Sequence, residues 1–217
     1  WKDREHGFWG REATQKVGWR FLVELADVAS LLVENKATES HWTALTDATD
    51  WYSDVGWKLD WAGEQLFKEQ PDLPSGLNGI RSRLRRGYLR TMDRVGRAFS
   101  KFLEKDSDKL NALPSAGEVL LAELEKQSTP TAIVFLDACR LDIGHRLRDL
   151  LNQGEPAQRA SVSVSVAPVP SITAIGMAFA LPIKRDELRV EVSGDGKFSV
   201  YANGFTGDLK WAEQRRN

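Results

Sequence analysis

Two short segments of the sequence combine residue types that could catalyse a reaction at phosphorus. Asp137 follows an apolar run at residues 131–136, and Ser171 and Thr173 lie between a proline-rich turn and a predicted helix. A carboxylate at the carboxyl end of a buried strand can hold a divalent cation. A hydroxyl at a helix N-terminus can attack phosphorus while the helix dipole stabilises the anion. Each residue also has a simpler interpretation, because Asp, Ser and Thr are common helix-capping residues.

Three residues that follow Asp137 could also take part in chemistry, and each has a structural alternative. Arg140 could bind a substrate phosphate, or it could form an ion pair with Asp142 or Asp149. His145 shares a helix face with these two aspartates, which could hold a metal, although an exposed charged helix is the simpler interpretation. Cys139 is the single cysteine. It has no accompanying His/Asn pattern, so we interpret it as a small buried side chain rather than a nucleophile.

The pattern of apolar residues predicts the elements that would position these side chains. The β-branched run at 131–136 is typical of a strand buried on both faces, and the strict alternation at 160–166 predicts a second strand. Strands that alternate with helices indicate an α/β domain with a partly parallel sheet over residues 129–217. The remaining elements expected in this domain are helices over 141–152 and 173–181 and a hairpin of strands 188–193 and 198–201.

Residues 1–128 are predicted to form a helical region, because their apolar residues recur at helical spacing. Pro71, Pro74 and Gly76 are expected to separate the second and third helices. The predicted helices cover about residues 21–32, 47–70, 80–105 and 117–127.

The helix predicted over residues 80–105 is strongly basic. Arg85, Arg86 and Arg90 could contact the phosphates of a nucleic acid. The same charges could instead form a solvated face or bind an acidic partner. The aromatic residues Tyr88, Phe99 and Phe102 fall on the apolar stripe of this helix, so we interpret them as core residues.

The composition excludes several classes of protein. The 217 residues carry 30 Lys+Arg against 31 Asp+Glu, which excludes a uniformly basic nucleic-acid-binding chain. A single cysteine excludes a disulfide framework and a thiolate cluster for zinc. No apolar run reaches the roughly 18 residues that span a bilayer, so a cytoplasmic protein is expected.

Two motifs match the pattern of a known family. The first is Ile133-Val-Phe-Leu-Asp137-Ala-Cys-Arg140, and the second is Pro170-Ser171-Ile-Thr173-Ala-Ile-Gly176-Met177. Together they resemble the PglZ domain, in which a hydrophobic strand ends in Asp, Arg follows, and a Pro-Ser/Thr-x-Thr-x-x-Gly-Met turn comes later. The resemblance covers about residues 130–210 well and 45–105 loosely. PglZ proteins belong to antiphage defence systems of the BREX and phage-growth-limitation type, and their domain resembles the alkaline phosphatase superfamily.

The resemblance implies a metal-dependent hydrolase of phosphoric esters. Asp137 would bind metal, Thr173 would be both a metal ligand and the nucleophile, Ser171 would be the neighbouring hydroxyl, and Arg140 would contact substrate. Members of the superfamily use two metal ions, and zinc is the expected metal. The other Asp and His ligands come late in the family's domain, whereas this chain has only three histidines, including His145. We therefore expect the chain to be a fragment that could be inactive alone.

Three functions remain as hypotheses. The preferred one is a metal-dependent phosphohydrolase of a bacterial antiphage defence system, whose partners would be other subunits of that system. The alternative is a structural subunit of a multi-protein defence complex with an incomplete hydrolase site. The third is a nucleic-acid-binding module that uses the arginine-rich helix.

Overall fold

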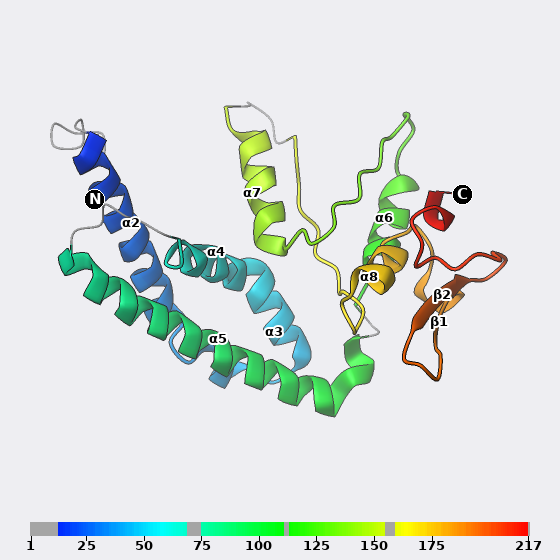
Figure 1. Cartoon of the computed structure of the whole chain (residues 1–217), viewed down its shortest axis with the longest axis horizontal. Helices are drawn as coiled ribbons and strands as arrows, with labels where there is room; N and C mark the ends of the chain where they lie inside the picture. Colours follow the sequence, from blue (N-terminus) through cyan, green and yellow to red (C-terminus); the bar gives the residue numbers. More distant parts are fainter. Residues whose placement is uncertain (1–12, 69–74, 111–112, 155–158, 217) are drawn as a thin grey trace. The chain divides into compact units, whose positions relative to one another are not determined.

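The computed structural model describes residues 13–68, 75–110, 113–154 and 159–216 (Figure 1). The chain divides into two compact units, residues 1–107 and residues 108–217. The division between the units falls between residues 107 and 108, so the short helix near 117 belongs to the second unit. No helix in the described ranges is both long enough and apolar enough to cross a membrane.

The first unit is helical, as its sequence predicts. Phe21, Leu25 and Val28 form one side of its core and contact Leu66, which directly follows a later helix. These residues recur at helical spacing and bury one stripe of their helices, which is the arrangement that stabilises helices in globular proteins. The elements are α2 (Ala13–Glu34), η2 (Thr38–His41), α3 (Leu45–Trp51), η3 (Tyr52–Gly56), α4 (Trp57–Gln65) and α5 (Ser75–Leu110), of which Figure 1 shows α2 to α5.

The helix predicted over residues 47–70 is interrupted by a turn of π-helix, η3. Beyond this turn, the carboxylate of Asp60 accepts hydrogen bonds from the hydroxyls of Tyr52 at 2.5 Å and Tyr88 at 2.8 Å. These two bonds join η3 and α4 to α5 through one partly buried carboxylate. Of the predicted break, Pro71 and Pro74 lie outside the described residues, and Gly76 lies within α5.

The close approach of α4 and α5 gives the first prediction. A Cβ atom on Gly63 would lie 2.4 Å from Cε2 of Tyr88, which is far inside van der Waals contact. We expect Gly63→Ala to lower the free energy of unfolding by about 1–3 kcal/mol, because the tyrosine must move and its bond to Asp60 must distort. Urea unfolding followed by far-UV circular dichroism would measure this loss.

Gly96→Ala is the matched control for that measurement. Gly96 is exposed in the middle of α5, with nothing within 4 Å of an added Cβ. Alanine should raise stability there by up to about 1 kcal/mol through helix propensity. Equal effects of the two substitutions would contradict the packing described.

The second unit is mixed α and β. Its hairpin is confirmed: β1 (Leu188–Val192) pairs antiparallel with β2 (Phe198–Ala202), with Val190 opposite Val200. Gly196 adopts the left-handed conformation in the connecting turn, with φ of 77°, as glycine readily does. The other elements are α6 (Ala116–Leu124), α7 (Leu141–Asn152), α8 (Thr173–Phe179), η4 (Arg185–Glu187) and η5 (Gln214–Arg216).

Helix α6 begins with a capping box, whose glutamate also contacts a later segment of the second unit. The N–H of Glu118 donates to the hydroxyl of Ser115, and the N–H of Ser115 donates to the Glu118 carboxylate at 2.7 Å. This bond from Ser115 holds the pKa of Glu118 below its usual value. The same carboxylate accepts from the N–H of Arg185 at 3.3 Å, so the start of α6 lies against the start of the hairpin region.

The two strands predicted before the hairpin differ from the structure. Residues 131–136 form no strand, and residues 160–166 contribute one isolated parallel bridge, between Val166 and Ser115. In the part of the chain that the structure describes, the backbone of 132–136 makes no backbone hydrogen bond. A strand requires a neighbouring strand on at least one side, and these residues have none here. The described sheet is therefore a two-stranded antiparallel one.

A carboxylate near the end of the chain stabilises the hairpin. Asp208 accepts hydrogen bonds from the N–H groups of Val200 at 3.0 Å and Lys210 at 3.1 Å, and it pairs with the Lys210 ammonium at 2.9 Å. Burial would raise the pKa of Asp208, but these bonds outweigh it and lower the pKa to about 2. The folded second unit therefore stabilises the ionised carboxylate of Asp208.

This carboxylate predicts acid sensitivity. The pKa of Asp208 is depressed in the folded state, so its contribution to stability is present above its ordinary pKa of 3.8 and is lost as pH falls toward about 2. Asp208→Asn should cost about 2 kcal/mol at neutral pH and flatten the dependence of stability on pH between about 4 and 2. Urea unfolding at a series of pH values would test this, with the exposed Asp186→Asn as the charge-matched control. An unchanged pH dependence would contradict the assignment.

Candidate functional site

The structure brings together two of the residues predicted to form a site, although they are 36 positions apart in the sequence. The hydroxyl of Thr173 donates to Asp137, with Oγ1 3.2 Å from Oδ2 and 3.5 Å from Oδ1. Both side chains are exposed, so solvent or a ligand can reach them. A hydroxyl beside a carboxylate is an arrangement that can bind a cation or present an oriented nucleophile.

Packing behind α8 fixes the position of Thr173. Thr173 is the first residue of α8, and Ile175 and Ala178 of this helix lie in a core with Val200 of β2 and Leu209. The alternation of exposed and buried positions follows from helical periodicity, which turns residue 173 outward when 175 and 178 point inward. The Thr173 hydroxyl is therefore held by a helix whose opposite side packs in the core.

A tight turn positions Asp137. Its Oδ1 accepts a hydrogen bond from the N–H of Ala138 at 2.9 Å. Ala138 has φ of 55°, the left-handed region that a non-glycine residue occupies at a cost of about 1 kcal/mol. The turn reverses the chain between residues 131–136 and helix α7. Backbone strain next to the candidate carboxylate is a feature frequently found at functional sites.

Ser171 is two residues before Thr173, but its hydroxyl makes no hydrogen bond with Asp137. Its side chain is exposed, and it makes no hydrogen bond with any other residue in the described part of the chain. The contact with Asp137 therefore distinguishes the two hydroxyls of the Pro-Ser-x-Thr turn. Whether Thr173 is the nucleophile, as the family resemblance implies, stays a prediction.

Arg140 forms the ion pair that was one of its two alternatives. Its guanidinium donates to Asp142 through Nε at 3.0 Å and through Nη2 at 2.8 Å. Asp142 is fully buried, whereas Arg140 is half-exposed. The bidentate pair holds the first turn of α7 against the residue that precedes it. A role of Arg140 at a substrate phosphate stays a prediction.

Two expectations for the neighbouring residues are wrong. Cys139 is exposed rather than buried, because it lies in the turn that follows Asp137. The polar face of α7 is not exposed throughout, because Asp142 and His145 are buried while Asp149 is exposed. The apolar side of this helix faces outward instead, and Leu150 is 61% exposed. Sequence periodicity defines the two faces of a helix but does not say which one is covered.

A complete metal site is not found in the described ranges. No group of three or more His, Cys, Asp or Glu side chains there could hold a metal ion. Asp137 and Thr173 supply two oxygen-bearing side chains, which are fewer than the ligands that a divalent metal ion requires. Of the other histidines, His41 lies in η2 of the first unit, and His6 lies outside the described residues.

The predicted nucleic-acid-binding arginines lie on α5 and are not equivalent. The guanidinium of Arg85 lies over the ring of Phe67, 4.2 Å from its centroid, so this side chain takes part in packing within the first unit. Arg86 and Arg90 are exposed and available to an anion.

No family model, no curated protein and no solved structure matches the chain.

The Arg140–Asp142 pair predicts a stability effect that is separate from chemistry. Asp142→Asn should lower the free energy of unfolding by about 2 kcal/mol, because it removes the charge from a buried group that accepts two hydrogen bonds. The measurement is urea unfolding of the full chain. Asp149→Asn, an exposed change on the same helix, is the control, and an equal effect of the two variants would contradict the assignment.

Proposed function

We propose that the second unit carries the nucleophile side of a metal-dependent phosphohydrolase site of the PglZ type. The observation that supports this proposal is the contact of Thr173 with Asp137, 3.2 Å between Oγ1 and Oδ2. Both residues belong to the motifs through which the sequence resembles that domain. An exposed hydroxyl next to a carboxylate suits attack on a phosphoric ester that approaches from solvent.

In the proposed reaction, Oγ1 of Thr173 attacks phosphorus and loses its proton, and the ester oxygen of the leaving group departs with the bonding electron pair and a proton. Water then hydrolyses the phosphothreonine and restores the hydroxyl. A divalent ion, zinc by resemblance, would supply a Lewis acid for the phosphoryl oxygens. Asp137 and Thr173 would be two of its ligands, and no group of three or more His, Cys, Asp or Glu side chains among the described residues would complete the site.

The remaining parts of the proposal follow from the resemblance alone. They are a partly parallel sheet of the alkaline phosphatase type in the complete domain, a cytoplasmic location and a role in bacterial antiphage defence. The partners would be other subunits of the defence system.

A structural subunit is the second candidate function, and one observation favours it. The second unit exposes apolar side chains in two neighbouring parts of the sequence, the run 133–136 and helix α7. Val134 is 76% exposed and Leu136 is 57% exposed. Contiguous exposed apolar surface is typical of a site that another protein segment covers. In this function the Asp137–Thr173 pair would be a remnant of a hydrolase site.

Hydrolysis of an aryl phosphodiester in the presence of zinc tests the enzymatic proposal. Thr173→Ala should reduce the rate at least about 100-fold, because it removes the nucleophile, and Thr173→Ser should retain part of the activity. Ser171→Ala is the matched control and should change the rate little.

Zinc-dependent hydrolysis that Thr173→Ala leaves at its full rate would contradict the phosphohydrolase. An inactive wild-type chain fits both a site that needs metal ligands from outside the described residues and the structural subunit. A longer form of the protein, assayed with the same Thr173→Ala control, would then separate the two functions.

A further inference from the structure

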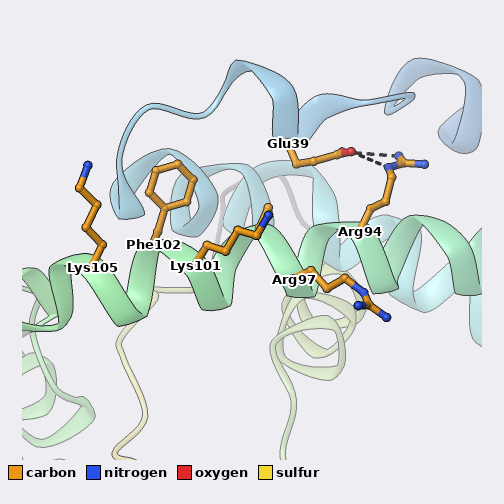
Figure 2. Close-up of a pocket in the computed structure, with 7 residues that line it drawn as sticks. Glu39, Arg94, Arg97, Lys101, Phe102 and Lys105 are labelled. Carbon is orange, nitrogen blue, oxygen red and sulfur yellow. Dashed lines mark hydrogen bonds and ion pairs between the residues drawn. The ribbon is translucent and has the colours of Figure 1, made fainter.

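A basic groove runs along the C-terminal half of α5, within the first unit. It has a volume of about 410 Å³ and is lined by Glu39 of η2 and by residues of α5 (Figure 2). The lining side chains of α5 that bear on its chemistry are Arg94, Arg97, Lys101, Phe102 and Lys105. This groove lies beyond Arg85, Arg86 and Arg90, and none of those three residues lines it.

The charges of the groove are only partly neutralised. Arg94 pairs with Glu39 at 2.5 Å, and Arg97 pairs with Asp93 at 2.9 Å. Lys101 and Lys105 form no ion pair in the described part of the chain. Two ammonium groups are therefore available to an anion, and the Arg97–Asp93 pair is exposed enough to exchange partners at little cost.

The cations are spaced regularly along the helix. Residues 97, 101 and 105 are four positions apart, so they share one side of α5 and follow each other at about 6 Å along its axis. Arg86 and Arg90 continue the same side toward the start of the helix. A line of single charges at this interval is suited to the backbone of an extended polyanion rather than to one compact anion.

An aromatic ring accompanies the charges. Figure 2 shows the side chain of Phe102 between those of Lys101 and Lys105, on the side of the helix that faces the groove. Phosphate-binding cations that alternate with an accessible ring are typical of surfaces for single-stranded nucleic acid, on which a base stacks and the backbone follows the cations. A run of Asp and Glu residues would use the cations but would offer no aromatic ring to stack on Phe102.

We propose that this groove binds single-stranded nucleic acid, with Arg97, Lys101 and Lys105 at successive phosphates and a base against Phe102. Binding is independent of sequence, because every base has a face that can stack. The proposal concerns the first unit and does not depend on the phosphohydrolase proposed for the second.

Fluorescence anisotropy with a labelled 12-nucleotide oligothymidine and the full chain tests the proposal. Lys101→Glu/Lys105→Glu should weaken binding by about tenfold or more at about 0.1 M salt. It should also reduce the slope of log affinity against log salt by about 1.4, since each lost phosphate contact removes about 0.7 for a single strand. Phe102→Leu should weaken binding while the slope stays unchanged, because stacking releases no counterion.

The matched control is Lys126→Glu/Lys184→Glu, which changes the net charge by the same amount at exposed lysines of the second unit. It should bind like the wild type. Three results would overturn the proposal: an equal loss in the control, a duplex bound more tightly than the single strand, or polyglutamate that competes as well as the unlabelled oligonucleotide. The last would assign the groove to an acidic protein instead. Thermal unfolding of each variant, with unchanged midpoints expected, shows that the loss of binding is not a loss of folding.

Discussion

The packing of Ile175 and Ala178 against Val200 and Leu209 joins helix α8 to the hairpin of the second unit. Helix α8 has seven residues, too few to be stable alone in water, and a two-stranded hairpin is also marginal by itself. Each becomes stable only by burying its apolar face on the other. The Asp208 hydrogen bonds reinforce the same contact, because they connect β2 to the segment that supplies Leu209. The exposed hydroxyl of Thr173 depends on this small core behind it.

The two halves of the candidate site are supported unequally. Thr173 is placed by a buried apolar core, whereas Asp137 follows a segment whose backbone makes no backbone hydrogen bond in the described part of the chain. Asp137 is held by its local turn at Ala138 and by the Arg140–Asp142 pair just beyond it. The contact between carboxylate and hydroxyl therefore joins a firmly held element to a weakly held one. A ligand that bound both side chains would add the support that the second element lacks.

Sequence patterns correctly predicted the helices and the hairpin, whose backbone hydrogen bonds join residues close in sequence. They wrongly predicted two strands that would need partners from elsewhere in the chain. The helices and the hairpin follow from apolar periodicity and from the glycines of the turn, and both are confirmed. The run 131–136 has the composition of a buried strand, but composition cannot supply the adjacent strand that would hydrogen-bond to it. Burial of Asp142 and exposure of Cys139 were missed for a similar reason, since both depend on which side of α7 and of its preceding turn is covered. The residues of the candidate site were predicted; the bond between Thr173 and Asp137 required the three-dimensional structure.

The uncovered run at 131–136 has a consequence for how the protein behaves in solution. It is a short segment rich in β-branched and aromatic residues, without charge, proline or glycine, and these are the properties of segments that form steric zippers. Its unpaired backbone groups can also template a second identical segment. Copies of this chain at high concentration would thus tend to associate through these residues and lose solubility. A segment or partner that covered this run would therefore also protect the protein from aggregation.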